Sequence, residues 1–90
     1  SRRSSRAAEV VVLDADAADL FERLRAVRLE IAREESIPPY MVFNDATLRE
    51  MAQKRPADRR EMLSVRGVGQ AKLDAFGDAF LEELERGADS

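Results

Sequence analysis

Apolar side chains recur every three or four residues in two long stretches of this 90-residue chain. Such spacing places them on one face of an α-helix, which is then buried against its neighbours. They are Leu20, Leu24, Val27 and Ile31 in the first stretch, and Leu73, Phe76, Phe80 and Leu84 in the last. Because no segment has a convincing strand pattern, the sequence predicts an all-α fold, a compact bundle of about four to five helices.

Prolines limit the first predicted helix. It begins near Asp16 and stops near Ser36, because Pro38 and Pro39 cannot continue a helix and the residue before a proline is pushed out of the helical region. We expect the segment that follows, residues 38–43, to be extended.

The second predicted helix follows Asn44, a good N-cap residue, and ends at Arg55, before Pro56. Phe43 before the cap and Leu48 within the helix have the spacing of a hydrophobic staple. Such a contact fixes the direction in which the chain enters the helix, so this stretch is first of all a structural device.

A short third helix is predicted from Arg59 to Leu63, because Asp58 and Glu61 have the spacing of a capping box. Gly67 and Gly69 then indicate a tight turn.

The last predicted helix is long and is closed by Gly87. Gly77 lies inside it and costs about 1 kcal/mol relative to alanine. We therefore expect either a neighbour that approaches closely at Gly77 or a bend or break in the helix.

The charge distribution indicates the limits of the domain. Residues 1–15 open with SRRSSR and contain a short apolar run at 10–13, which predicts a basic flexible linker or strap. Residues 16–87 form the predicted helical domain, and residues 88–90 a disordered tail. This organisation is typical of a module from a longer protein.

The amino-acid composition excludes most kinds of enzyme catalysis. The chain has no cysteine and no histidine, so disulfides, thiolate nucleophiles, imidazole bases and the usual zinc ligand sets are excluded. Its carboxylates lie beside arginines on amphipathic helices, where a catalytic pair would need a pocket. The acidic run from Asp14 lacks the glycine and glutamate of a calcium loop. We predict no catalytic, metal-binding or cofactor-binding residue.

The net charge is -3 and the pI is about 5.0, which argues against a domain whose whole surface attracts phosphate. Any affinity for nucleic acid must come from a local patch. We find no signal peptide and no membrane-spanning run, and the lack of cysteine fits a reducing compartment. The expected location is cytoplasmic, and the expected state of the fragment is monomeric.

Gly67, Val68 and Gly69 precede a helix that carries Lys72, an arrangement that resembles half of a helix-hairpin-helix element. Two glycines let the backbone approach a phosphate, and free amides at a helix start favour an anion. The alternative is a turn that needs positive φ and has no ligand. Leu73 stands where such hairpins often have alanine.

Tyr40 could stack on an unpaired base, and Met41 could extend that apolar platform. Alternatively, the ring of Tyr40 packs against the first helix, with only its hydroxyl at the surface. The basic residues considered as its neighbours are Lys54, Arg55, Arg66, Lys72 and Arg28. Cations of this kind could equally pair with Glu22, Glu50 or Asp74, each pair contributing about 0.2–0.5 kcal/mol.

Two stretches carry a family resemblance: LFERLRAVRLEIAREESIPPYMVFNDATLREMA and EMLSVRGVGQAKLDAFGDAFLEEL. The combination of PPYxVFxDATL with GVGxxKLxxFG resembles the HRDC domain, the helicase-and-RNase-D C-terminal module, as found in bacterial RecQ-type DNA helicases. The resemblance covers Leu20 to about Leu84.

The resemblance implies a helical bundle of the orthogonal, SAM-like kind and no catalysis within the module. It also implies a parent enzyme, a RecQ-type helicase acting near the nucleoid or else an RNase D-like exonuclease. In the helicase, a separate core would hydrolyse ATP with Mg²⁺ and unwind DNA 3′ to 5′ in repair and recombination. In RecQ-like copies that bind single-stranded DNA, the tyrosine after the two prolines lies in or beside the binding patch, and here it is Tyr40.

Two functional hypotheses follow. In the first, the domain tunes how its parent engages particular DNA structures, through weak contact with single-stranded or branched DNA. The residues expected to make that contact are Tyr40, Arg66, Gly67, Gly69 and Lys72, flanked by Lys54, Arg55 and Arg28. In the second, the domain docks on the helicase core or another protein and regulates it without touching DNA, as its acidic surface and basic N-terminal tether suggest.

Overall fold

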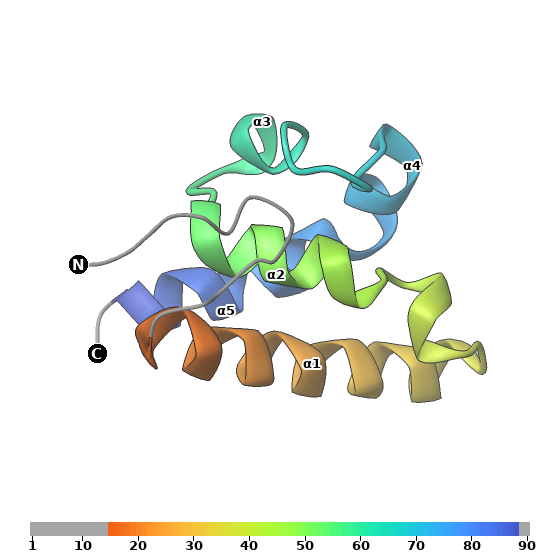
Figure 1. Ribbon diagram of the computed structural model, residues 1–90. Coiled ribbons are helices and arrows are strands. Elements are labelled where there is room, and N and C mark those ends of the chain that lie inside the picture. The colour runs from red at the N-terminus through yellow and green to blue at the C-terminus, as the bar shows by residue number, and fades with distance from the viewer. Residues whose placement is uncertain (1–14, 89–90) are drawn as a thin grey trace.

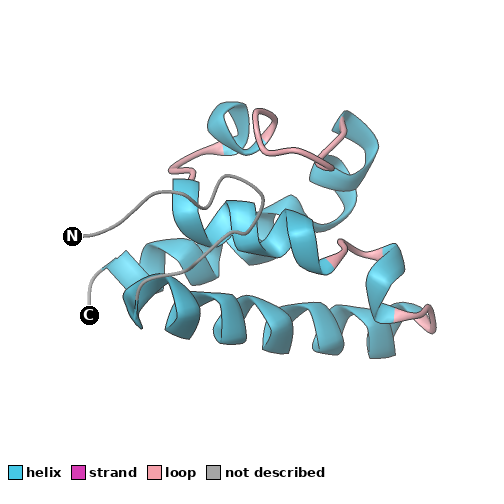
Figure 2. Ribbon diagram, in the orientation of Figure 1, coloured by secondary structure: helices cyan, strands magenta, loops and turns pink. Residues whose placement is uncertain are grey.

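A computed structural model describes residues 15–88 of the chain, and the linker or strap predicted for residues 1–15 lies almost wholly outside them. The described residues contain helices and turns but no strand, which confirms the predicted all-α fold (Figure 2). In order, they are α1 Ala15–Glu35, η1 Pro39–Met41, α2 Asp45–Lys54, α3 Arg59–Met62, α4 Gln70–Lys72, η2 Leu73–Gly77 and α5 Asp78–Ala88. None of these helices combines the length and apolar content that crossing a membrane requires.

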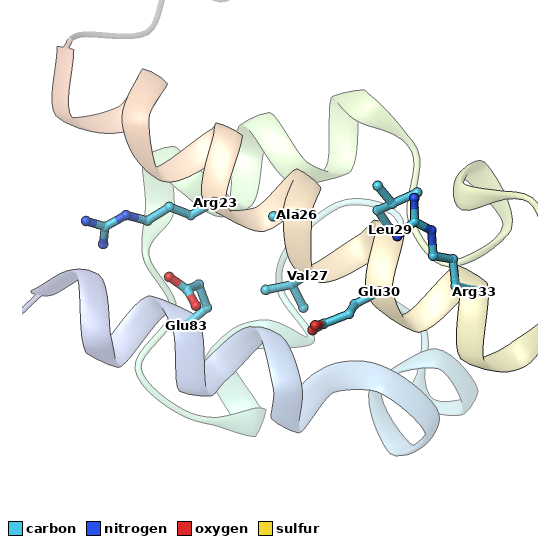
Figure 3. Close-up of a pocket in the computed structure, with 7 residues that line it drawn as sticks. All are labelled: Arg23, Ala26, Val27, Leu29, Glu30, Arg33 and Glu83. Atoms are coloured by element: carbon cyan, nitrogen blue, oxygen red, sulfur yellow. The ribbon is translucent and has the colours of Figure 1, made fainter.

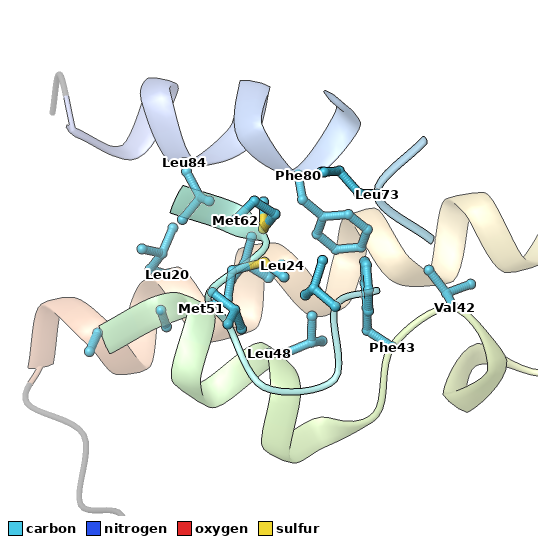
Figure 4. Packing of buried hydrophobic residues seen from close by; sticks show 14 of the residues in the cluster. Leu20, Leu24, Val42, Phe43, Leu48, Met51, Met62, Leu73, Phe80 and Leu84 are labelled. Carbon is cyan, nitrogen blue, oxygen red and sulfur yellow. The ribbon is translucent and has the colours of Figure 1, made fainter. Parts of the chain in front are cut away.

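Helix α1 is the longest element, and α2 and α5 lie over it in Figure 1. The short helices α3 and α4 lie on the far side of α2 from α1. Side chains from α1, α2, α3 and α5 point toward one another and form one hydrophobic core (Figure 4). The largest fully buried residues in it are Phe43, Phe80, Leu24, Leu48, Met51, Met62 and Leu73.

The predicted start of α2 is confirmed. The side-chain oxygen of Asn44 accepts a hydrogen bond from the Thr47 backbone N–H at 2.8 Å. Phe43 and Leu48 are both buried in the core, as a hydrophobic staple requires. The helix ends at Lys54, where Arg55 adopts a left-handed conformation with φ 49° and closes the last turn before Pro56.

The prediction of an extended segment at residues 38–43 is wrong in its central part. Pro38 is extended, but Pro39 to Met41 form one turn of 3-10 helix. The backbone N–H groups of Met41 and Val42 donate to the carbonyls of Pro38 and Pro39, both at 3.0 Å. A proline suits the first position of such a turn, because its φ is already helical and it has no N–H to leave unpaired.

The last helical run also differs in detail from the prediction. It starts at Gln70, passes through a π-helical turn at Leu73–Gly77 and ends at Ala88, one residue beyond Gly87. A Cβ atom at Gly77 would lie only 2.5 Å from Leu73 Cδ1. The close neighbour and the helix irregularity, expected as alternatives, therefore occur together.

Candidate nucleic-acid interface

The 3-10 turn η1 holds two large apolar side chains in solvent. Tyr40 is 67% exposed and Met41 is 48% exposed, whereas Val42 and Phe43, which follow directly, are buried. The alternative in which the tyrosine ring packs away against the first helix is therefore wrong. A rigid turn next to a buried anchor presents this ring at the surface.

Phe43 is that anchor. Its ring meets the rings of Phe80 and Phe76 edge to face, with centroids 5.2 and 6.4 Å apart. Its carbonyl oxygen accepts a hydrogen bond from Arg28 Nη1 at 3.0 Å. Because both the side chain and the backbone of Phe43 are held, the position of Tyr40, three residues earlier, is set by the core.

The loop after α3 runs alongside α2 in the opposite direction. Lys54 Nζ near the end of α2 donates to the carbonyl of Ser64 at 3.5 Å, and Glu50, one turn earlier, accepts from the Arg66 backbone N–H at 2.9 Å. Gly67 then lies against Thr47 near the start of α2. The loop therefore carries the glycine turn toward the end of α2 that follows η1 (Figure 1).

The two glycines of this turn have different roles. Gly67 has φ 91°, and a Cβ atom there would overlap Thr47 Oγ1. Gly67 therefore fits the alternative given for this turn, a residue that needs positive φ. Gly69 has φ -95°, and a Cβ atom there would meet nothing within 4 Å. The start of α4 is therefore open to an approaching group.

Lys72 connects the glycine turn with the aromatic turn. Its Nζ lies 6.0 Å from the centroid of the Phe43 ring, within the range of a cation–π contact. Lys72 is the last residue of α4 and Gly69 is the N-cap of that helix, while Tyr40 lies on η1, three residues before Phe43. Among the described residues, neither Lys72 nor Arg66 forms a salt bridge, although the charge of Arg66 contributes to lowering the pKa of Glu50.

The structure places the remaining predicted cations elsewhere. Lys54 and Arg55 lie at the opposite end of α2 from η1, and Lys54 forms an ion pair with Glu50 at 3.0 Å. Arg28 is 9% exposed and donates to Phe43 O and Asp45 Oδ1. We group Tyr40, Met41, Gly69 and Lys72 with Arg66 as the η1–α4 surface; Arg66 lies at its Lys54 side, because Glu50 binds both Lys54 and the Arg66 backbone N–H.

Glu50 holds the loop of Arg66 to α2, and its pKa is lowered from the ordinary value of 4.5, first by the backbone N–H of Arg66 and then by Lys54. A carboxylate whose pKa falls on folding stabilises the folded state above that ordinary value, and the contribution disappears as the pH falls through the folded-state pKa. We expect Glu50→Gln to lower the free energy of unfolding by about 0.5–1 kcal/mol at pH 7. Urea titrations should show this difference closing below about pH 4.

The matched control for this prediction is Glu34→Gln, because Glu34 is exposed on α1 and has no ion pair within residues 15–88. This control should unfold like the parent chain at both pH values. A Glu50→Gln variant equal to the parent at pH 7 would contradict the prediction.

Sequence reasoning missed the structural role of Arg28 and the partners of Arg59. Arg28 Nη1 lies 2.8 Å from Asp45 Oδ1, and the hydrogen bond from Arg28 is the main reason that the pKa of Asp45 is lowered. A signal existed for Arg28, because it continues the buried spacing of Leu20 and Leu24. Arg59 of α3 contacts both Asp74 and Asp78, which no local pattern indicates.

Within residues 15–88, no cluster of three or more carboxylate, imidazole or thiol side chains is placed to hold a metal ion. The η1–α4 surface groups an exposed aromatic and an exposed thioether side chain with two cations that form no salt bridge within residues 15–88. Such a set can stack on a planar ring and neutralise phosphates.

Comparisons with known proteins agree with this architecture. The family model described as the HRDC domain matches residues 17–84. The chain is 59% identical over 67 residues to the ATP-dependent DNA helicase RecQ of Haemophilus influenzae and 51% identical over 67 residues to that of Bacillus subtilis. Each match covers 74% of this chain and 11% of the relative, so the chain spans about a tenth of the length of these curated relatives.

The chain is also 35% identical over 82 residues to the ATP-dependent DNA helicase UvrD2 of Mycobacterium tuberculosis, a match that covers 91% of the chain and 11% of the relative. A solved structure described as "D. radiodurans RecQ HRDC domain 3" superposes with a TM-score of 0.79 at 32% identity. It covers 82% of this chain and 97% of that one.

Proposed function

This chain belongs to the HRDC domain family, and we propose that it is an auxiliary nucleic-acid-binding module of a larger RecQ-type DNA helicase. The RecQ relatives support the choice of parent, because they are named ATP-dependent DNA helicases and share more than half of their aligned residues with this chain. In this proposal, ATP and Mg²⁺ act in the helicase core of the parent, and the module contributes no catalytic group.

The observation that carries the proposal is the exposed ring of Tyr40, held beside Met41 on a proline-led turn three residues before Phe43, whose ring Lys72 contacts. An unpaired base can stack on the tyrosine ring without regard to its sequence. Lys72 and Arg66 neutralise neighbouring phosphates, and the open backbone at Gly69 lets the strand come close. The ligand class is a single strand, or the unpaired part of a branched DNA.

The overall charge of -3 makes this contact weak. Phosphate neutralisation supplies much of the affinity of any protein for nucleic acid, and only two unpaired cations belong to the η1–α4 surface. The module therefore adjusts how the parent engages a DNA structure and does not hold DNA tightly by itself. Affinity should decrease as salt increases.

The proposal predicts that Tyr40→Ala weakens binding of a fluorescent single strand about tenfold at low salt, because stacking contributes about 1–3 kcal/mol per base. Lys72→Ala should also reduce the slope of log affinity against log salt by about 0.7, the loss of one phosphate contact. Fluorescence anisotropy titrations of the isolated domain measure both effects.

The controls are Tyr40→Phe, which keeps the ring, and Arg60→Ala, which removes an exposed cation of α3 that forms no salt bridge within residues 15–88. Both should bind like the parent chain. No detectable binding at high micromolar concentration, or binding unchanged by Tyr40→Ala and Lys72→Ala, would refute the η1–α4 surface as a DNA site.

A docking function is the second candidate, and the exposed pair Tyr40 and Met41 also supports it, because aromatic and methionine side chains are enriched in protein interfaces. In that case the domain contacts the helicase core and changes its ATPase or unwinding specificity. Deleting the domain from the full-length parent would then alter that specificity although the isolated domain binds no DNA. An unchanged parent would count against docking.

A further inference from the structure

Helix α1 presents a second face that the core and the η1–α4 surface do not use. Its exposed residues Glu22, Ala26, Leu29 and Arg33 follow one another at spacings of four, three and four, which is the spacing of a helix–helix seam. Leu29 is 43% exposed although it is a large apolar residue. We call these four residues the α1 seam.

A hollow lies beside the seam on the side of α5. It has a volume of about 360 Å³ and is lined by Arg23, Ala26, Val27, Leu29, Glu30, Arg33 and Glu83. Figure 3 shows Glu83 reaching from α5 toward α1, with Val27 and Glu30 directed toward the gap between the two helices. The small side chain of Ala26 leaves room in this hollow for an apolar side chain from another molecule.

We propose that this face is a weak homodimer interface, in which α1 packs antiparallel on α1 of a second copy of the chain. This face is complementary to a second copy of itself. Under a two-fold axis, a residue that contacts its partner on the second copy is contacted in return by the equivalent residue. A surface suits such an axis only if its charges are opposite across the centre.

The charges of the α1 seam meet this condition. Ala26 and Leu29 lie at its centre, and Glu22 and Arg33 lie four residues to either side. With the axis between Ala26 and Leu29, each Leu29 faces Ala26 of the other copy and each Glu22 faces Arg33. Leu29 then enters the hollow that Ala26 leaves, as a knob enters a hole.

The flank beside α5 repeats the pattern. Arg23 and Glu30 both line the hollow, and they lie on opposite sides of the same centre, so each Arg23 faces Glu30 of the other copy. Neither Glu30 nor Arg33 has an ion-pair partner within residues 15–88, and Arg23 has only an exposed contact with Asp19 at 3.4 Å. Dimerisation would therefore give partners to Glu30 and Arg33, while Glu22 would exchange or share its exposed 3.3 Å contact with Arg25.

The expected affinity is low. Helix α1 has 21 residues and is about 31 Å long, so the buried area falls at the low end of specific interfaces. The central contact is limited to leucine and alanine, and the charged pairs mainly fix the register of the two helices. We expect a dissociation constant of about 0.1–1 mM. The chain is then monomeric at low concentration, as its sequence predicts.

Charge exchange tests the register directly. The Arg33→Glu variant has glutamate at both ends of the seam, and the Glu22→Arg variant has arginine at both ends. Because like charges then face each other, each variant alone should dimerise at least tenfold more weakly than the parent chain. An equal mixture of the two should associate again, because every glutamate then faces an arginine. Sedimentation equilibrium up to about 1 mM measures all three samples.

The matched control is Arg60→Glu, which makes the same change of charge on α3, outside the seam, and should leave dimerisation unchanged. All the exchanged residues are exposed, so circular dichroism should show the parent fold in each variant. A parent chain that stays monomeric to about 1 mM would overturn the proposal. Single variants that dimerise like the parent, or a mixture that stays monomeric, would do the same.

Discussion

Phe43→Ala is expected to lower the free energy of unfolding by about 3–5 kcal/mol, the usual loss for a buried phenylalanine. Phe43 is 1% exposed and contacts the rings of Phe76 and Phe80. A domain of this size has a stability of about 5–10 kcal/mol, so the variant would lose much of it. Thermal and urea unfolding followed by circular dichroism measure the loss.

Phe43→Leu is the control, because it stays apolar and fills much of the same volume. It should lose less than Phe43→Ala, about 1–2 kcal/mol. Since Phe43 also anchors η1 and its ring contacts Lys72, Phe43→Ala should weaken the proposed DNA binding even where the domain remains folded. A loss of stability below about 1 kcal/mol would show that Phe43 does not anchor the turn to the core.

Arg28→Ala is expected to lower the free energy of unfolding by about 2–3 kcal/mol. The guanidinium is buried, and removing it takes the hydrogen bond away from the Phe43 carbonyl as well as from Asp45. Most of this loss of stability comes from the carbonyl oxygen of Phe43. Without Arg28 it is buried with no hydrogen-bond donor to offset its desolvation.

The Asp45→Asn variant separates the contribution of the Arg28–Asp45 ion pair from that of the hydrogen bond between Arg28 and the Phe43 carbonyl. The Asp45 side chain is 54% exposed, so losing this ion pair should lower stability by no more than about 1 kcal/mol, while Arg28 keeps its bond to Phe43. Urea titrations of both variants at pH 7 test whether Arg28→Ala lowers the free energy of unfolding more than Asp45→Asn does. An Asp45→Asn variant as unstable as Arg28→Ala would contradict it.

The helices were predictable because their signals are local. Pro38 prevents α1 from continuing. Asn44 caps α2 through its own side chain, and Asp58 caps α3 by accepting a hydrogen bond from the Glu61 backbone N–H at 2.9 Å. Each signal acts within a few residues, where sequence distance and spatial distance agree. The turn at Pro39–Met41 was missed because a pair of prolines is compatible with both an extended and a 3-10 backbone.

The candidate site was predictable only in part. Tyr40, Gly69 and Lys72 come from the sequence; the structure exposes Tyr40, leaves space at Gly69 and places Lys72 Nζ 6.0 Å from the centroid of the Phe43 ring. Lys54 was grouped with them because it is a nearby cation, but a helix of ten residues holds it at the other end of α2. Arg28 was grouped with them for the same reason, although it lies within the buried stripe of α1.

The sequence alone determined the helical class, the approximate helix limits and the family, because helical period, caps and prolines act over short distances. The tertiary structure decided whether Tyr40 is buried or exposed and which cations are free. It also decided which face of α1 remains uncovered. These properties depend on contacts between residues far apart in the chain, such as Arg28 with Phe43 and Glu50 with Arg66, and no local pattern encodes them.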